Sequence, residues 1–257
     1  MNTIDLTQAA VWLPLFFFVA MGIAMLSYVV LDGYDLGIGM LLNRGTDAEK
    51  DMMIASIGPF WDANETWIVL GVGLLLVAFP LAHGVILTEL YLPVAAMLLG
   101  LILRGVSFDF RVKVNIEQKP LWNLLFYIGS LVASVSQGIM IGRLIVGFDS
   151  GLLGWLFSVL VGLCLPAGYV LLGSTWLILK TEGDLQKKAF RWAKMSLWLT
   201  GFGVALVSIA TPYFSPEIMH KWFAWPLMHR QPSRVCLTSA EPGVFAPRWV
   251  QCSGYGA

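Results

Sequence analysis

Charged side chains are scarce in this chain. Lys, Arg, Asp and Glu make up 12% of its 257 residues, whereas 58% of the residues are hydrophobic. A water-soluble domain of this size carries roughly 25% charged residues, so about half of the usual surface charge is missing. Such a surface is stable only where lipid covers most of it. The composition therefore argues against a soluble catalytic domain and predicts an integral membrane protein.

Other shortages exclude further classes. The 16 basic residues are balanced by 16 acidic ones, so no net positive charge is available to bind nucleic acid. The three cysteines show no metal-binding or disulfide spacing, and no phosphate-binding glycine loop or Ser/His/Asp arrangement is present. Only His83, His220 and His229 exist, and no two of them share an apolar run. The chain therefore lacks the paired axial ligands of a multi-haem centre, and no metal site is predicted.

Long apolar runs, by contrast, are abundant. About 20 apolar residues are needed to cross the hydrocarbon of a bilayer, and a backbone in lipid must satisfy its polar groups within the segment. The sequence therefore predicts an all-α, polytopic transmembrane helix bundle with about six spans. The predicted spans are 11–31, 67–80 (with a start near Ile57), 85–103, 121–144, 152–179 and 195–214.

The basic residues are distributed unevenly between the loops. The loops after the first, third and fifth runs carry most of them, whereas the opposite loops hold little beyond Arg143 and Lys221. By the positive-inside rule, the N-terminus should be periplasmic and the odd-numbered loops cytoplasmic. The basic residues assigned to the odd-numbered loops are Arg44, Lys50, Arg104, Arg111, Lys113, Lys119, Lys180, Lys187, Lys188, Arg191 and Lys194.

The last thirty or so residues differ in character from the rest. Residues 228–257 contain proline, serine and glycine throughout, without a helical period, and include two of the three cysteines. Such a stretch buries too little apolar area to pack as a domain. We therefore predict a helix bundle over residues 1–227 and a disordered tail over residues 228–257.

Ionisable residues next to the apolar runs gather in three stretches. Asp32 and Asp35 lie in LDGYDLG, Asp62 and Glu65 in GPFWDANETW, and Arg104 in LRGVSFDFR. Each charged group within a span costs about 2.5–3.5 kcal/mol on insertion scales, so such groups are functional candidates. By the predicted orientation all three stretches face the cytoplasmic side. We therefore expect one polar cluster at a single depth.

The second stretch suggests a chemistry for that cluster. Pro59 suits the first turn of a helix, and Ser56 is a candidate cap for it. Asp62 and Glu65 then lie at positions i and i+3 on one helix face. A pair of carboxylates at the membrane margin, with Trp61 beside it, suits the capture of protons from the cytoplasm. We predict that these three residues form a proton pathway.

Purely structural interpretations of the same residues remain open. Asp32 and Asp35 would also suit the end of a helix at a solvated loop. Asp62 and Glu65 would also complement the positive end of a helix dipole. Arg104 is either an ordinary positive-inside charge or the cation of a buried ion pair with Asp62 or Asp35.

Three motifs, in this order, carry a resemblance to a known family. They are LDGYDLGIGML, GPFWDANETWIVLGVGLLLVAFP and LYLPVAAMLLGLILRGVSFDFR. Together they resemble subunit II of the cytochrome bd-type quinol oxidases, in the cyanide-insensitive branch of bacterial respiratory chains. The resemblance covers roughly residues 5 to 227.

The resemblance implies a heterodimer in the bacterial inner membrane. The partner, subunit I, would carry haem b and haem d (or b in its place) and oxidise quinol, while the complex reduces dioxygen to water. In this family the positions matching Trp61 and Asp62 are associated with proton entry. Those matching Asp35 and Arg104 are associated with maintaining the haem environment of the partner. The chain itself would carry no cofactor.

Two further expectations follow. The family carries roughly eight or nine helices, so about six spans followed by an atypical tail resemble a C-terminally truncated or frameshifted member. The alternative function is an ion-coupled secondary transporter, in which intramembrane carboxylates couple ions to a substrate. A transporter should place charges near the bilayer midplane in both halves of the chain, whereas here they crowd one margin of the first half.

Overall fold

The computed structural model describes residues 9–148 and 151–214 of the chain, so the predicted tail at 228–257 lies outside the described residues. The described part is almost entirely helical and contains no strand. Six of its helices are long and apolar enough to cross a membrane, which confirms the predicted class of fold. The helices are α1 (Ala9–Leu41), α2 (Asp47–Ile57), α3 (Trp61–Ala78), α4 (Pro80–Glu89), α5 (Tyr91–Lys113), α6 (Lys119–Ile145), α7 (Leu152–Lys180) and α8 (Gly183–Phe214), with short 3-10 turns at η1 (Leu42–Arg44) and η2 (Ile116–Gln118).

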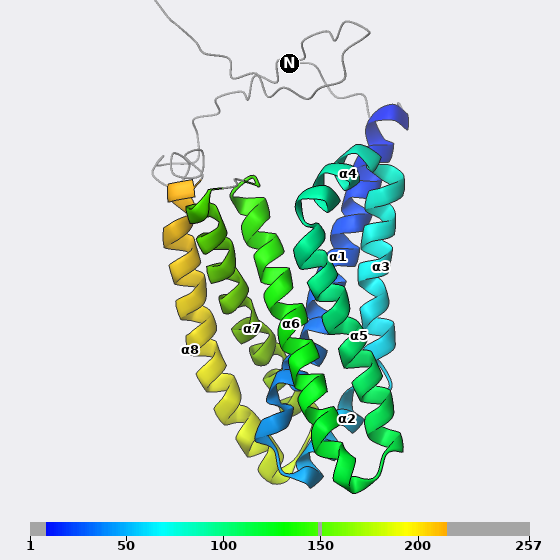
Figure 1. Cartoon of the computed structure of the whole chain (residues 1–257), viewed down its shortest axis with the longest axis vertical. Helices are drawn as coiled ribbons and strands as arrows, with labels where there is room; N and C mark the ends of the chain where they lie inside the picture. The colour runs from blue at the N-terminus through cyan, green and yellow to red at the C-terminus, as the bar shows by residue number, and fades with distance from the viewer. Residues whose placement is uncertain (1–8, 149–150, 215–257) are drawn as a thin grey trace, which may run out of the picture.

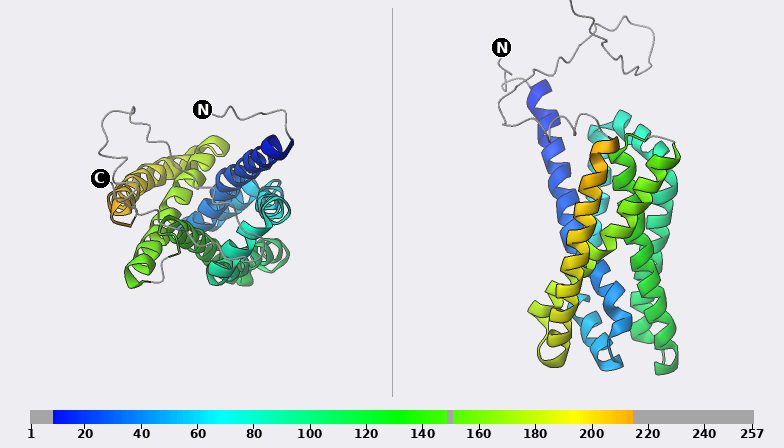
Figure 2. Two further views of the ribbon diagram at one scale, coloured as in Figure 1. Left: turned by 90° about the horizontal axis from the view of Figure 1, so that it is seen from above. Right: turned by 90° about the vertical axis from the view of Figure 1, so that its left-hand side faces the viewer.

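The long helices lie side by side along the long axis of the molecule (Figure 1). The second half of α1 is enclosed by the bundle, and the helix contacts α3, α6 and α7. Helix α5 packs on α6, α6 on α7 and α7 on α8. Viewed along the bundle axis, α8 and α3 lie towards opposite sides (Figure 2). The short helix α2 lies at one end of the bundle and α4 at the other (Figure 1).

Two helix crossings bring backbones into direct contact. A Cβ atom added to Gly37 of α1 would lie 1.9 Å from the carbonyl oxygen of Tyr169, and one added to Gly173 of α7 would lie 2.6 Å from the Gly37 carbonyl carbon. In the same way, a Cβ on Gly129 of α6 would lie 2.6 Å from the Gly100 carbonyl oxygen of α5. Small residues at such crossings allow the close van der Waals packing that holds helices together in lipid. The first crossing fixes α1 against α7, and the second fixes α5 against α6.

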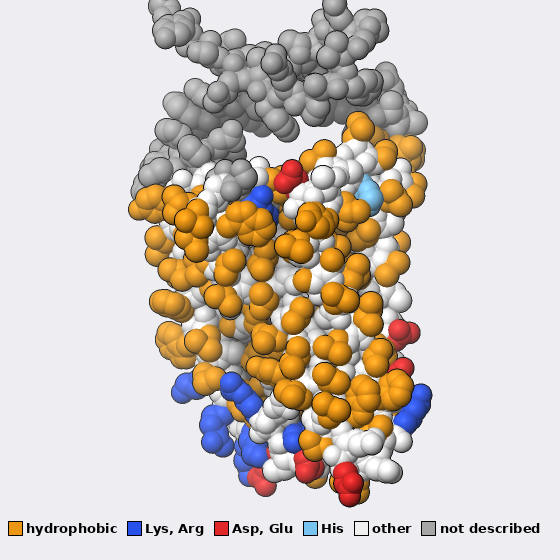
Figure 3. Space-filling model, in the orientation of Figure 1, with side chains coloured by type: hydrophobic (Ala, Val, Ile, Leu, Met, Phe, Trp, Pro, Cys, Tyr) orange, Lys and Arg blue, Asp and Glu red, His pale blue; other side chains and the backbone are white. Residues whose placement is uncertain are grey.

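Apolar side chains cover the middle of the surface, and most of the Lys and Arg side chains on the face shown gather at one end (Figure 3). This is the end at which α2 lies, whereas α1 begins at the opposite end (Figure 1). The charge asymmetry between the loops is therefore present in the folded molecule. Assigning the basic end to the cytoplasm, and the N-terminus to the periplasm, stays a prediction.

Helix α1 is longer than the sequence predicted. It continues past 31 to Leu41, and Asp32 and Asp35 therefore lie inside it, with 0% and 1% of their surface exposed. The interpretation of these aspartates as solvated helix-end charges is wrong. The helix continues because both carboxylates find partners within the bundle, so no water is needed to solvate them.

The second span begins after a turn. Helix α2 ends at Ile57, and α3 begins at Trp61. Ser56 lies inside α2, where its hydroxyl donates to the carbonyl of Met53 (2.7 Å), so it does not cap α3. Pro59 lies in the turn between the two helices and has no N–H to extend the hydrogen bonds of α2. The predictions of a Ser56 cap and of Pro59 in the first helical turn were wrong.

The predicted third span is divided into two helices. Helix α4 ends at Glu89, Leu90 has a non-helical conformation (φ −107°, ψ 12°), and α5 begins at Tyr91. In a continuous helix, Pro93 would face the carbonyl of Glu89, four residues earlier. It has no N–H to donate to that carbonyl, and its ring would clash with it. The break therefore follows from a proline that the sequence displays, and the membrane-spanning helix starts later than predicted.

Candidate functional site

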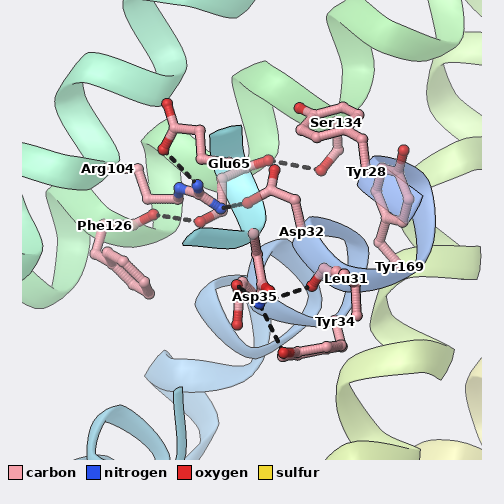
Figure 4. Close-up of polar contacts among 12 residues, drawn as sticks. Tyr28, Leu31, Asp32, Tyr34, Asp35, Glu65, Arg104, Phe126, Ser134 and Tyr169 are labelled. Atoms are coloured by element: carbon pink, nitrogen blue, oxygen red, sulfur yellow. Dashed lines mark hydrogen bonds and ion pairs between the residues drawn. The ribbon is translucent and has the colours of Figure 1, made fainter. Parts of the chain in front are cut away.

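The guanidinium of Arg104 is the centre of a buried charge cluster. It extends from α5, and only 1% of its surface is exposed. Its Nη1 lies 2.7 Å from Oδ1 of Asp32 on α1, and its Nη2 lies 2.8 Å from Oε2 of Glu65 on α3 (Figure 4). One cation therefore joins carboxylates from two other helices. We call Arg104, Asp32 and Glu65 the arginine cluster.

A second set of polar contacts lies directly beside this cluster. Asn64 of α3 donates from its Nδ2 to Oδ2 of Asp35 (2.9 Å) and to the hydroxyl oxygen of Tyr34 (2.6 Å). Asp35 follows Asp32 by three residues on α1, so both carboxylates project towards α3 and α5 (Figure 4). Residues from all three polar stretches thus meet, as predicted.

The partners of Arg104 differ from the predicted ones. The expected buried pair exists, but it involves Asp32 and Glu65 in place of Asp62 or Asp35. The interpretation of Arg104 as an ordinary positive-inside charge is also wrong, because the residue is buried within α5 and paired with two carboxylates. Sequence spacing could not identify the partners, since they depend on how α1 and α3 are rotated against α5.

A hydrogen-bonded group of three residues lies next to Asp32 and was not predicted. Gln137 of α6 donates from Nε2 to the hydroxyl oxygen of Tyr28 on α1 (2.7 Å), and the hydroxyl of Tyr169 on α7 donates to Oε1 of Gln137 (2.5 Å). Tyr28 and Asp32 are one helical turn apart, and Tyr28 and Tyr169 both lie near Asp32 in Figure 4. An amide within an otherwise apolar run was the signal for Gln137.

The three residues of the predicted proton pathway have different surroundings. The side chain of Trp61 is half-buried and packs on Phe108 of α5, with ring centroids 4.9 Å apart. Glu65 holds Arg104 and keeps 27% of its side chain exposed. Asp62 is exposed in the first turn of α3 and has no ion pair with any described residue. Asp62 is therefore exposed, whereas Glu65, three residues further along α3, contacts the buried cation.

Helix α2 is held to the basic end of the bundle by an ion pair. Lys188 of α8 donates to both carboxylate oxygens of Glu49 (2.7 and 2.8 Å), and Glu49 also accepts from the backbone N–H of Thr46 (2.7 Å) in a capping box. The hydrogen bond from Lys188, followed by that from Thr46, lowers the pKa of Glu49 below its usual value of 4.5. Glu49 therefore stays ionised at neutral pH and connects α2 to α8.

The donors of a metal or haem site are sparse in the described residues. They contain no group of three or more His, Cys, Asp and Glu side chains placed to hold a metal ion. His83, on the short helix α4, is the single histidine within residues 9–148 and 151–214, and Cys164 is a free thiol on α7. The described part of the chain therefore contains no pair of histidines that could serve as axial haem ligands.

The helix bundle and its buried cluster define a multi-pass membrane protein with intramembrane ionisable groups. Residues 13–247 match the family described as cytochrome bd terminal oxidase subunit II. The chain therefore belongs to this family, which confirms the resemblance to subunit II inferred from the three motifs.

Curated relatives support the same assignment. The chain is 30% identical over 205 residues to "Cytochrome bd ubiquinol oxidase subunit 2" of Bacillus subtilis, covering 75% of this chain and 59% of the relative. It is 28% identical over 210 residues to "Cytochrome bd-I ubiquinol oxidase subunit 2" of Escherichia coli K12, covering 75% of this chain and 55% of the relative. A "Probable cytochrome oxidase subunit 2" of Haemophilus influenzae is 28% identical over 184 residues, covering 65% and 49%. The chain thus spans about half the length of the curated relatives it matches.

Proposed function

We propose that the chain is a haem-free subunit II of a bacterial inner-membrane quinol:oxygen oxidoreductase. Its partner would be subunit I, which carries haem b and haem d (or b in its place), accepts electrons from quinol and reduces dioxygen to water. The names of the relatives as ubiquinol oxidase subunits support this activity. Within the chain, the arginine cluster carries the proposal, because buried charges in a membrane bundle mark ion and proton sites.

The first part of the role is to stabilise the partner. Arg104 and Asn64 tie α1, α3 and α5 together, with Asp32, Glu65 and Asp35 as acceptors. In lipid no water replaces a lost partner, so this polar set fixes the three helices against one another. A fixed arrangement of these helices would give subunit I a constant surface on which to keep its haem environment intact. Asp35 and Arg104 therefore support the haems indirectly.

The second part of the role is proton uptake. The reduction of dioxygen to water consumes protons as well as electrons, so the oxidase needs a supply of protons from the aqueous side. Asp62 is exposed and has no ion pair with any residue that the structure describes, so its carboxylate is accessible from outside the bundle. Glu65, one turn further along α3, is partly exposed and already bound to Arg104. We assign proton capture to Asp62 and the inner end of the proton pathway to Glu65. Trp61 holds the start of α3 on α5.

The distribution of buried carboxylates favours this function over an ion-coupled transporter. Within the described residues, the buried acidic groups of the spans are Asp32 and Asp35, both on the second half of α1. A transporter with paired repeats would be expected to place coupling charges in both halves of the chain.

Co-purification tests the proposal. We would co-express the chain with its subunit I, purify the complex through a tag on this chain, and record its visible absorption spectrum. Haem absorbance should accompany the tagged wild type and be strongly reduced for Arg104→Leu. It should be unchanged for Lys113→Gln, because Lys113 is an exposed basic residue on the same helix. Wild-type chain that purifies without haem absorbance would contradict the proposed function.

A further inference from the structure

A cleft of about 370 Å³ lies at the basic end of the molecule, between α2, α5 and the start of α6. Its volume is within the range of small-molecule sites, roughly 300–1,000 Å³. One part of the wall is apolar and the other part is charged. The apolar part is Ile54, Ala55, Gly58, Phe108 and Val112, and the charged part is Asp51, Arg111 and Lys119.

The charged wall has more positive than negative charge. Nη2 of Arg111 lies 2.8 Å from Oδ1 of Asp51, and Nζ of Lys119 lies 3.5 Å from the same oxygen. Two cations therefore share one carboxylate, and the cleft keeps a net charge of +1. Arg111 is also fixed in place, because its Nε donates to Oδ1 of Asn123 and only 4% of its side chain is exposed. A guanidinium held in this way is preorganised to bind a phosphate.

The cleft opens where lipid would meet water. Val112 is 67% exposed and Ile116, just after it, is 82% exposed, so apolar side chains flank the cations on the outside. The basic end follows directly below the apolar belt in Figure 3. Basic pockets between transmembrane helices at this depth suit the headgroups of anionic lipids.

We propose that this cleft binds the phosphate headgroup of an anionic phospholipid such as phosphatidylglycerol. Arg111 and Lys119 bind the phosphate oxygens, and the first acyl carbons lie on Phe108 and Val112. Asp51 is the competing acceptor, because the phosphate must share or replace its contacts to both cations. The proposal does not depend on the oxidase function, since it rests on the charges and shape of a different part of the molecule.

Native mass spectrometry of the purified, delipidated full-length chain tests the proposal. Phosphatidylglycerol should bind more tightly than phosphatidylcholine, which has the same phosphate but a compensating positive charge. Lys119→Gln should weaken phosphatidylglycerol binding about five-fold, because a direct ion pair between a partly exposed lysine and the phosphate contributes about 1 kcal/mol. Lys113→Gln, an exposed neighbour that does not line the cleft, should have no effect.

Asp51→Asn should change phosphatidylglycerol binding in the opposite direction. Because it removes the competing negative charge, it should strengthen phosphatidylglycerol binding, whereas a merely structural ion pair would leave binding unchanged or weaken it. Equal binding of the two lipids, or equal losses for Lys119→Gln and Lys113→Gln, would overturn the proposal. Displacement of the lipid by millimolar inorganic phosphate would show that the cleft is a site for free phosphate and would also overturn it.

Discussion

The two groups of ion pairs in this molecule have similar chemistry but different surroundings. In the arginine cluster, Arg104 and Asp32 are 1% and 0% exposed, and lipid-facing helices enclose them. At the basic end, each pair has one buried and one more exposed member: Arg111 (4% exposed) binds Asp51 (53%), and Glu49 (9%) binds Lys188 (34%). A lost partner leaves an uncompensated charge in the first case, whereas in the second case water already reaches one member of each pair and screens its charge. Since the distances are similar (2.7 and 2.8 Å), burial decides how much each pair contributes to stability.

The largest effect is expected for Arg104→Leu. The variant leaves Asp32 and Glu65 without their cation, and breaking a buried ion pair costs about 3–5 kcal/mol. The free energy of unfolding, measured by titration with sodium dodecyl sulfate in mild detergent, should fall by this amount. Adding Asp32→Asn to the same variant should recover part of the loss. A double variant no more stable than Arg104→Leu would show that the stranded carboxylate is not the cause.

The next effect tests whether packing, as well as charge, holds the buried region. Gly37→Ala places a methyl group into the backbone of α7 and should destabilise the bundle by about 1–3 kcal/mol. Gly73→Ala is the matched control, because no atom lies within 4 Å of the added methyl group. The control should be neutral or stabilising by up to about 1 kcal/mol, since Ala favours a helix more than Gly. The same unfolding measurement applies, and equal effects of the two variants would mean that α1 and α7 are not in backbone contact.

A smaller and pH-dependent effect is expected at the basic end. Glu49→Gln removes the ion pair with Lys188 and should cost about 1 kcal/mol at pH 7, similar to the loss of a helix cap. The pKa of Glu49 is lowered in the folded protein, so its contribution is complete above the unfolded value of 4.5 and is lost as the pH falls through the lower folded value. The difference in Tm between wild type and variant should therefore shrink below about pH 4.5. A difference that is constant between pH 7 and pH 3 would exclude the ion pair as its origin.

The smallest effect is expected for Lys187→Gln. Lys187 pairs with Asp184 one turn away on α8, but the two side chains are 76% and 87% exposed. Water solvates both charges, so the pair should add nothing measurable to stability. Thermal unfolding of this variant should coincide with that of the wild type. A decrease in Tm as large as that of Glu49→Gln would contradict the distinction between buried and exposed ion pairs.

The class of fold could be predicted because the spans depend on local composition. Six apolar runs were sufficient to locate six membrane-spanning helices, since hydrophobic length is a property of each segment alone. The boundaries were less predictable. Asp32 and Asp35 would end a helix in water, but they continue α1 because α3 and α5 supply partners. The division at Leu90, however, followed from Pro93 and was open to prediction.

The sequence was sufficient to predict which residues belong to the site, but it was not sufficient to predict which of them contact one another. The cost of charge in lipid identified Asp35, Glu65 and Arg104 without any structure. The pairing of Arg104 with Asp32 depends on the relative rotation of helices far apart in the sequence, and no local pattern encodes it. The roles of Trp61 and Asp62 in proton entry stay a prediction.

The most direct test of the account uses Asp62→Asn in the chain co-expressed with its subunit I. Asparagine keeps the size and hydrogen bonding of the side chain but cannot take up a proton as a carboxylate does. Haem content and oxygen consumption should be measured on the same purified sample, beside Arg104→Leu. We predict that Asp62→Asn keeps its haem and consumes oxygen more slowly, whereas Arg104→Leu loses haem. Normal haem content together with normal oxygen consumption in Asp62→Asn would contradict the assignment of this residue to proton entry.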